Sequence, residues 1–316
     1  MKSLKIGNVR LKNRLFLSPM VDVTDLPYRI ICRKAGAGMA YTEMLYIDAI
    51  LHDNPRTVGL MKVNRGEKVG LQITGNSEEE FDKFVASKKW KKFALIDLNC
   101  GCPSMRITGN QAGSYLLQNP DKIARMIGIL KKTGKPISVK IRLGFKENNV
   151  LEVAKIIEKA GASALTVHAR LATHGRDVPA DWKWIKKVKE SVNMIVIGNG
   201  DVFTGKDAER MMKETNCDAV MVARGAIGDP YVFERILYYF KTGKEKEFDI
   251  KKNLKAFYEY LTLEKKHYGN KVDIGRVKYA GGKFLRGFQG AAEKRAEFMM
   301  LRDVEEMKRF VSGLLQ

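Results

Sequence analysis

Eight short apolar segments recur along the amino-terminal part of the chain, and this repeat constrains the fold more than any other feature. They lie at residues 14–18, 39–42, 69–74, 94–99, 137–142, 164–168, 194–198 and 219–223. Amphipathic segments typical of helices lie between them, at residues 26–34, 78–87, 121–131, 150–159, 182–191 and 206–214. Strands that alternate with helices form parallel βαβ units, and eight such units are typical of a closed (β/α)8 TIM barrel.

A doubly wound open sheet is the alternative fold for such a repeat. That fold usually carries a glycine-rich turn after its first strand. Here the first strand leads into Ser18-Pro19-Met20, and no GxGxxG pattern follows it. The sequence therefore favours an α/β chain built on a TIM barrel.

The chain changes character after residue 240. A charged segment, KTGKEKEFDIKKN, leads into a region without strand-like segments, in which helical patterns cover residues 252–268, 276–285 and 291–315. We therefore predict a barrel domain over residues 1–240, followed by an all-helical domain over residues 241–316.

The charge balance points to a polyanionic partner. The chain has 57 Lys and Arg residues against 36 Asp and Glu residues, which gives a formal net charge of +21. A field of that sign attracts nucleic acid, although a lysine-rich surface without a nucleic-acid partner would show the same balance. In the helical domain, Lys278, Lys283 and Arg286 lie among aromatic residues and glycines, which suits contact with RNA phosphates.

The sequence predicts a protein that works away from membranes. No apolar run approaches the roughly 20 residues that span a bilayer, and the first residues lack the continuous apolar stretch of a signal peptide. We therefore expect a cytoplasmic monomer with no membrane partner and no obligate protein partner.

Two of the four cysteines, Cys100 and Cys102, lie one residue apart at the end of the fourth apolar segment. Four scattered cysteines do not make a disulfide framework. A CxC without a second pair of ligands is also a poor zinc site, since tetrahedral zinc needs four converging ligands. We expect no metal, and a single reactive thiol is the remaining chemical interpretation.

Polar residues gather where the predicted strands end, which is where barrel active sites lie. They include Gln72, Asn99, Lys140, Arg142, His168, Arg170 and Asn199. The loops after the seventh and eighth strands, IGNGDVF and ARGAIGDP, carry glycines and Arg224 at the usual phosphate site of such barrels. A flavin mononucleotide (FMN) fits a site with a phosphate at one end and a planar, hydrogen-bonding group at the other.

The sequence resembles the tRNA-dihydrouridine synthase family along essentially the whole chain. The resemblance rests on SPMVDVTDLPYR, AYTEM, LQITG, DLNCGCPSMRITGNQAGSYLL, VKIRLG, VHAR, IGNGDV and ARGAIGDPYVFERI, in this order and spacing. The resemblance implies an oxidoreductase and flavoprotein that takes part in tRNA processing by reducing the C5=C6 bond of particular uridines in tRNA. It implies FMN as cofactor, with NADPH, or NADH, as the reductant.

The resemblance also implies roles for individual residues. Cys102 would be the catalytic proton donor to uracil C5. Cofactor contacts would come from Pro19, Met20, Gln72, Asn99, Lys140, His168, Asn199, Gly200, Asp201, Arg224 and Gly225. Contacts to tRNA would come from Asn99, Arg106, Arg142, Arg170, Lys278, Lys283 and Arg286.

This chain departs from the family pattern at three places. The common APMAGVTD reads SPMVDVTD, Arg106 takes the place of a common lysine, and LATHGRDVPADW follows Arg170 in place of a stretch often rich in Gln, Tyr and Gly. The sequence leaves open which uridine is reduced. Two other functions also remain open, namely an FMN barrel that reduces a free pyrimidine, similar to dihydroorotate dehydrogenase, and an RNA-binding barrel without activity.

Overall fold

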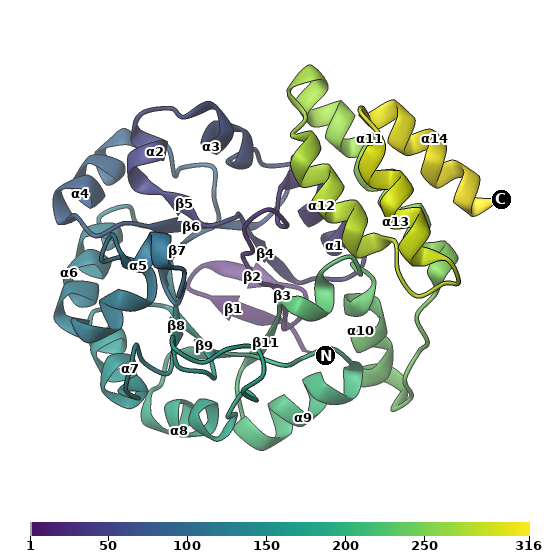
Figure 1. Cartoon of the computed structure of the whole chain (residues 1–316). Helices are drawn as coiled ribbons and strands as arrows, with labels where there is room; N and C mark the ends of the chain where they lie inside the picture. The colour runs from purple at the N-terminus through teal and green to yellow at the C-terminus, as the bar shows by residue number, and fades with distance from the viewer. Residues whose placement is uncertain (1) are drawn as a thin grey trace.

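The computed structural model describes residues 2–316 and contains a closed barrel of eight parallel strands surrounded by helices (Figure 1). In barrel order the strands are β3 (Leu15–Leu17), β4 (Met39–Tyr41), β6 (Val69–Thr74), β7 (Leu95–Cys100), β8 (Ile137–Arg142), β9 (Ala164–His168), β10 (Ile195–Asn199) and β11 (Ala219–Val222). β11 pairs with β3, and β4 pairs with β6, so the sheet closes on itself. The two-residue β5 (Leu45–Tyr46) extends the edge of β6. The predicted TIM barrel is confirmed.

Helices cover the outside of the barrel, and local sequence signals explain where they begin. They are α1 (Leu26–Lys34), α2 (Ile47–Leu51), α3 (Pro55–Leu60), α4 (Glu78–Ser87), α5 (Met105–Thr108), α6 (Pro120–Lys131), α7 (Val150–Lys159), α8 (Lys183–Ser191), α9 (Gly205–Thr215) and α10 (Val232–Thr242). Asp25 caps α1 by accepting from the Tyr28 N–H, and Thr204 forms a capping box at α9. Such caps satisfy backbone donors that the first helical turn leaves free.

The two faces of each strand have different neighbours. On β7, Leu95 packs inside the barrel, and Asp97 and Asn99 follow it at the same period-2 positions. Leu98 and Cys100 alternate with them and belong to the apolar layer between the sheet and the helices. The inward face is therefore apolar at the amino-terminal end of the barrel and polar at the carboxyl end, where the site lies.

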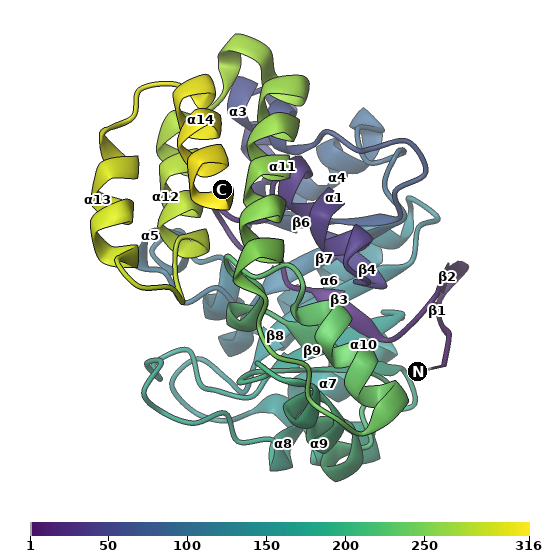
Figure 2. The ribbon, with the colours of Figure 1, turned by 90° about the vertical axis from the view of Figure 1, so that its right-hand side faces the viewer.

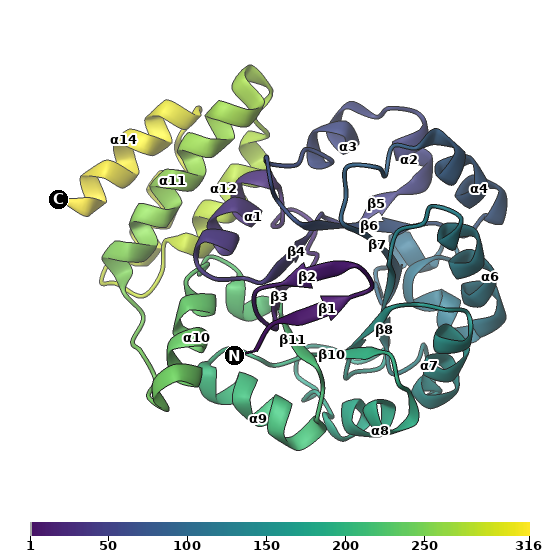
Figure 3. The same ribbon diagram turned by 180° about the vertical axis from the view of Figure 1, so that it is seen from behind.

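A hairpin that the sequence analysis did not predict covers the amino-terminal end of the barrel (Figure 3). It consists of β1 (Leu4–Ile6) and β2 (Val9–Leu11), which pair antiparallel. Ile6, Val9 and Leu11 are buried in one cluster with inward residues of the barrel strands. The hairpin therefore closes this end with apolar side chains.

The helical region after residue 243 packs beside α1 on one side of the barrel (Figure 2). It contains α11 (Ile250–Tyr268), α12 (Ile274–Phe284), α13 (Ala291–Met300) and α14 (Val304–Leu315). The single helix predicted over 291–315 is wrong, because the chain breaks after Met300 and Asp303 caps a new helix. No helix within residues 2–316 is both long and apolar enough to span a bilayer.

The helical region shares its core with the barrel. The Tyr28 ring of α1 lies edge-on to Tyr260 and Phe284, with ring centroids 6.2 and 5.9 Å apart. The buried Asp25 carboxylate accepts from the Tyr260 hydroxyl at 3.0 Å and lies 3.0 Å from Arg276 Nε. The two predicted domains therefore meet through a buried aromatic and ionic contact.

Candidate active site

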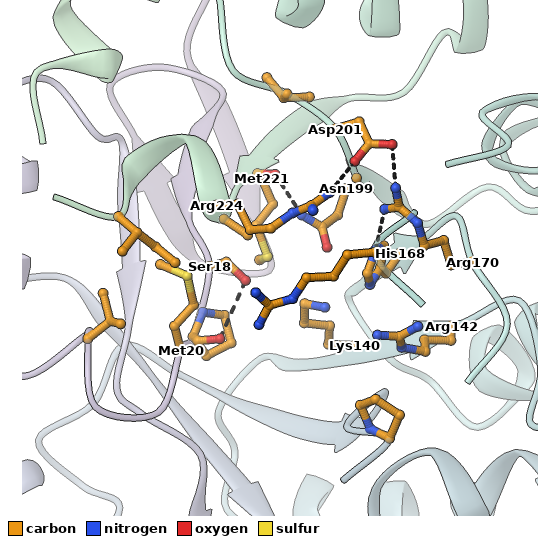
Figure 4. A pocket seen from close by; sticks show the side chains of 18 of the residues that line it. Ser18, Met20, Lys140, Arg142, His168, Arg170, Asn199, Asp201, Met221 and Arg224 are labelled. Atoms are coloured by element: carbon orange, nitrogen blue, oxygen red, sulfur yellow. Dashed lines mark hydrogen bonds and ion pairs between the residues drawn. The ribbon is translucent and has the colours of Figure 1, made fainter. Parts of the chain in front are cut away.

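A cavity of about 480 Å³ opens at the carboxyl ends of the strands (Figure 4). Ser18, Pro19 and Met20 line one side of it, following β3. Lys140 and His168 line the opposite side. They lie on the inward faces of β8 and β9. This volume is within the usual range for a small-molecule site.

Cationic side chains converge with His168 on this cavity, as Figure 4 shows for Lys140, Arg142, Arg170 and Arg224, and Arg176 also lines it. Burial, together with Arg142, lowers the pKa of the Lys140 ammonium to about 8. Burial and the nearby cations lower the pKa of His168 well below its usual value, so the imidazole is neutral at physiological pH. This cationic wall, formed by the lysine and arginine side chains named above, strongly favours an anionic ligand.

The neutral His168 has a defined tautomer. Its Nε2 lies 3.2 Å from Arg170 Nη1, and a guanidinium can only donate hydrogen bonds. Nε2 is therefore the acceptor, which leaves the proton on Nδ1.

Asp201 holds two of the arginines in place. Its carboxylate accepts from Arg170 Nη2 at 2.6 Å, from Arg224, and from the Ala180 N–H at 2.8 Å. Arg170 lowers the pKa of this carboxyl against the opposing effect of burial. Asp201 is predicted at the phosphate end of a cofactor, and the structure places it in the lining of the larger cavity together with both arginines.

The glycines of the same two loops allow close packing. Gly200 has a φ of +123°, a conformation that side chains rarely adopt, and a Cβ there would lie 2.8 Å from Ala180. A Cβ at Gly225 would lie 2.6 Å from the Val202 carbonyl oxygen. Gly200 lines the cavity, whereas Gly225 supports the loop from behind.

A smaller cavity of about 190 Å³ adjoins the first and shares Pro19, Lys140, Arg142 and His168 with it. Its own lining includes Gln72, Asn99 and Cys102. Together the two cavities run from the cationic wall to the cysteine.

A chain of hydrogen bonds orients the residues beside the cysteine. Gln72 Nε2 donates to Asp97 at 2.7 Å, and Asn99 Nδ2 donates to Gln72 Oε1 at 2.9 Å. Asn99 Oδ1 then accepts from the Cys102 N–H at 3.0 Å and from the Gly101 N–H. Because a carboxylate can only accept, Asp97 fixes which way both amides face.

Asp97 itself is fully buried, and burial raises its pKa to about 6 against the opposing effects of Ser138, Gln72 and Lys140. Asp97 is not among the predicted site residues, because the prediction covers residues at the strand ends. The signal was present, since Asp97 lies two positions before Asn99 and therefore on the same inward face.

The two neighbouring cysteines lie in different surroundings. Cys100 is completely buried among apolar side chains, and burial raises the pKa of its thiol well above the usual value. Cys102 is partly exposed and lines the smaller cavity. Cys100 is the last residue of β7 and faces the helix layer, whereas Cys102 lies in the loop after the strand, so of these two thiols only Cys102 lines a cavity.

The loop after β3 is held by residues that the sequence analysis did not assign. Thr24 Oγ1 accepts from the Met20 N–H at 3.0 Å, and Glu43 accepts from the Asp22 N–H at 3.0 Å. Asp22 stands where the family commonly has glycine, adopts a φ of +62°, and pairs with Arg56 at 2.5 Å. These contacts fix Pro19 and Met20 against the cavity.

The remaining predicted RNA contacts lie outside both cavities. Arg106 is exposed on α5, and Lys278, Lys283 and Arg286 lie on or just after α12. Arg286 is 3.9 Å from Asp229. The structure brings Tyr279, rather than its basic neighbours, to the edge of the larger cavity.

Fold and site together define a class: a (β/α)8 barrel with an anion-binding cavity and a single partly exposed thiol at the carboxyl ends of its strands. Comparisons with known proteins narrow this class. Residues 16–315 match the dihydrouridine synthase (Dus) family, and the chain belongs to that family.

Individual relatives agree with this assignment. The chain is 33% identical over 315 residues to a probable tRNA-dihydrouridine synthase 1 of Synechocystis, covering 97% of this chain and 88% of that protein. It is 36% identical over 234 residues to tRNA-dihydrouridine synthase B of Pasteurella multocida, covering 73% of this chain and 70% of the relative. Among solved structures, a variant of NCR from Zymomonas mobilis shares the fold, with a TM-score of 0.52, 16% identity, and coverage of 79% of this chain and 94% of that one.

Proposed function

We propose that this protein is a tRNA-dihydrouridine synthase that reduces the C5=C6 bond of uridine in tRNA. The observation that carries the proposal is the single partly exposed thiol, Cys102, in a small cavity that adjoins the cationic one, in a chain of the dihydrouridine synthase family. The net charge of +21 supports a nucleic-acid substrate.

The cavity fits FMN. Lys140 forms no ion pair within residues 2–316, and burial lowers the pKa of its ammonium to about 8 although Asp97 acts in the opposite direction. Gln72 and Lys140 would bond the edge of the ring, with Pro19 and Met20 packed against it. Arg224, Asn199 and Gly200 would hold the phosphate end. When bound, the flavin supplies hydride to uracil C6, and we propose NADPH or NADH as its reductant.

The chain's own residues supply the proton and the orientation. The Cys102 thiol donates its proton at uracil C5 as a general acid. Asn99 holds the Cys102 backbone through its Oδ1, and His168 lines the same cavity. The thiolate left on Cys102 must recover a proton before the next turnover.

We further propose that the helical region over residues 241–316 binds tRNA. Lys278, Lys283 and Arg286 would contact phosphates there, with Arg106, Arg142 and Arg170 at the barrel. A base must leave the RNA stack to reach Cys102, and phosphate contacts hold the rest of the molecule while it does so. Binding should therefore weaken steeply with salt. A cytoplasmic monomer is part of this proposal.

The test compares two cysteine variants on tRNA from a strain that lacks the enzyme. Cys102→Ala should lose most dihydrouridine formation, measured by mass spectrometry, and keep its flavin and its tRNA affinity. Cys100→Ala is the matched control and should remain active, because its side chain only packs in the core. Equal losses would show that the thiol assignment is wrong, and turnover of free uracil or orotate alone would overturn the proposed substrate.

A further inference from the structure

Tyr279 is the residue of the helical region that reaches the main cavity. It lies on α12, 42% of its surface is exposed, and it lines the cavity together with residues of the barrel loops. The sequence leaves open which aromatic residues of this region pack in the core and which contact RNA. A large ring exposed at the mouth of a polar cavity needs another explanation.

The surroundings of Tyr279 fix its place relative to the barrel. One turn away, Arg276 is buried and pairs with Asp25 at 3.0 Å and with Glu264 at 3.1 Å. Further along the helix, Gly281 lies so close to Phe298 that a Cβ would be 2.1 Å from its ring. The exposed ring of Tyr279 therefore stands on a rigid helix rather than on a mobile loop.

One cation lies over the ring, and further basic side chains line the same cavity. The Lys283 ammonium lies 5.1 Å from the ring centroid of Tyr279. His174 and Arg176, in the loop after β9, line the same cavity. Exposed aromatic faces flanked by cations are what proteins use to hold unpaired nucleotides, because the ring stacks on a base and the cations meet phosphates.

We propose that Tyr279 stacks on a nucleobase next to the uridine that enters the cavity, and that Lys283 binds the phosphate between them. This inference rests on the proposed function and adds a second nucleobase site to it. When a uridine leaves the stack, its neighbour loses a stacking partner. The ring of Tyr279, at the edge of the cavity, takes that place.

The chain contains a matched control. Tyr258 on α11 is 37% exposed and has the Lys308 ammonium 5.5 Å from its ring centroid. It therefore resembles Tyr279 in exposure and in its lysine partner, and it is not among the residues that line the described cavities. Tyr258→Ala should change neither activity nor RNA binding.

The experiment measures dihydrouridine formation on an unmodified tRNA transcript by wild type, Tyr279→Ala, Tyr279→Phe and Tyr258→Ala. Stacking of one base on an aromatic ring contributes about 1–3 kcal/mol, so Tyr279→Ala should lower kcat/KM at least about fivefold. Tyr279→Phe should stay near wild type, since it keeps the ring. Flavin content and the rate of flavin reduction without RNA should be the same in all four proteins.

Fluorescence gives a readout that a purely structural role would not move. A tRNA with 2-aminopurine beside the target uridine should be quenched on binding wild type and Tyr279→Phe, and less by Tyr279→Ala. Unchanged kcat/KM in Tyr279→Ala, an equal loss in Tyr258→Ala, or slower flavin reduction without RNA would each overturn the inference. A wild-type protein inactive on tRNA would instead overturn the proposed function.

Discussion

Replacing Asp97 with asparagine should make this protein more stable and less active. Asp97 is fully buried inside the barrel, where burial raises the pKa of its carboxyl from an ordinary 3.8 to about 6. At neutral pH the folded protein therefore holds a charge that the unfolded chain carries more easily. Asparagine has the same shape and removes that charge.

The size of the effect follows from the pKa. A shift of about 2 units corresponds to about 3 kcal/mol, because one unit is 1.36 kcal/mol. Below pH 3.8 the carboxyl is protonated in both states, so the variant and wild type should be almost equally stable. As the pH rises from about 4 to above 6, wild type loses this stability and the variant does not. The free energy of unfolding of the variant should therefore exceed that of wild type by up to about 3 kcal/mol at pH 8.

Activity should fall for a separate reason. The Asp97 carboxylate only accepts hydrogen bonds, whereas an asparagine amide can present either an oxygen or an NH2 group to Gln72. The side-chain amides of Gln72 and Asn99 can then both flip by 180°. In the flipped orientation Asn99 Oδ1 no longer accepts from the Cys102 N–H. Losing one such hydrogen bond costs about 1 kcal/mol, so kcat should fall about fivefold.

Urea unfolding of the cofactor-free proteins at pH 4 and pH 8 tests the stability part of this prediction. Asp121→Asn is the control, since Asp121 is exposed on α6 and its replacement should change stability by less than about 0.5 kcal/mol at either pH. The reasoning would be refuted if Asp97→Asn were less stable than wild type at pH 8. It would also be refuted if the variant's free energy of unfolding exceeded that of wild type by the same amount at both pH values. A variant with unchanged kcat would refute the role given to the hydrogen-bond chain.

Two further predictions concern the thiols and the helical region. In the native cofactor-free protein, iodoacetamide should modify one cysteine, Cys102, because Cys32, Cys100 and Cys217 are buried; mass spectrometry of Cys102→Ala should then show no rapid modification. Deleting residues 244–316 should leave an insoluble or unfolded barrel, since Tyr28 and Asp25 would lose the partners that bury them; a soluble truncated chain with native circular dichroism would contradict the shared core.

Most of the barrel could be predicted from the sequence, because each strand and helix is specified by its own local pattern. All eight predicted strands form, and the helices predicted over 26–34, 78–87 and 150–159 have those bounds in the structure. The hairpin was missed although its signal is local. Gly7 and Asn8 separate two short alternating segments, a typical hairpin turn, and Gly7 has a φ of +55°.

The site was less predictable, because it depends on contacts between distant segments. The position of Cys100 follows from strand register alone, but the pairing of Asp201 with both Arg170 and Arg224 joins three different loops. The contact of Asp25 with Arg276 joins opposite ends of the chain and brings Tyr279 to the cavity. Helical periodicity indicates that α12 has a buried face, but not that its other face meets the active site.

The hairpin of β1 and β2 has a consequence for the order of events in catalysis. Its apolar side chains fill the amino-terminal end of the barrel, so the reductant and the RNA that we propose would both reach the site from the opposite end. Two large molecules that need the same entrance cannot be bound for reaction at the same time. On this proposal the reductant leaves before the uridine arrives, and initial rates measured against one substrate at several fixed levels of the other should give parallel double-reciprocal lines.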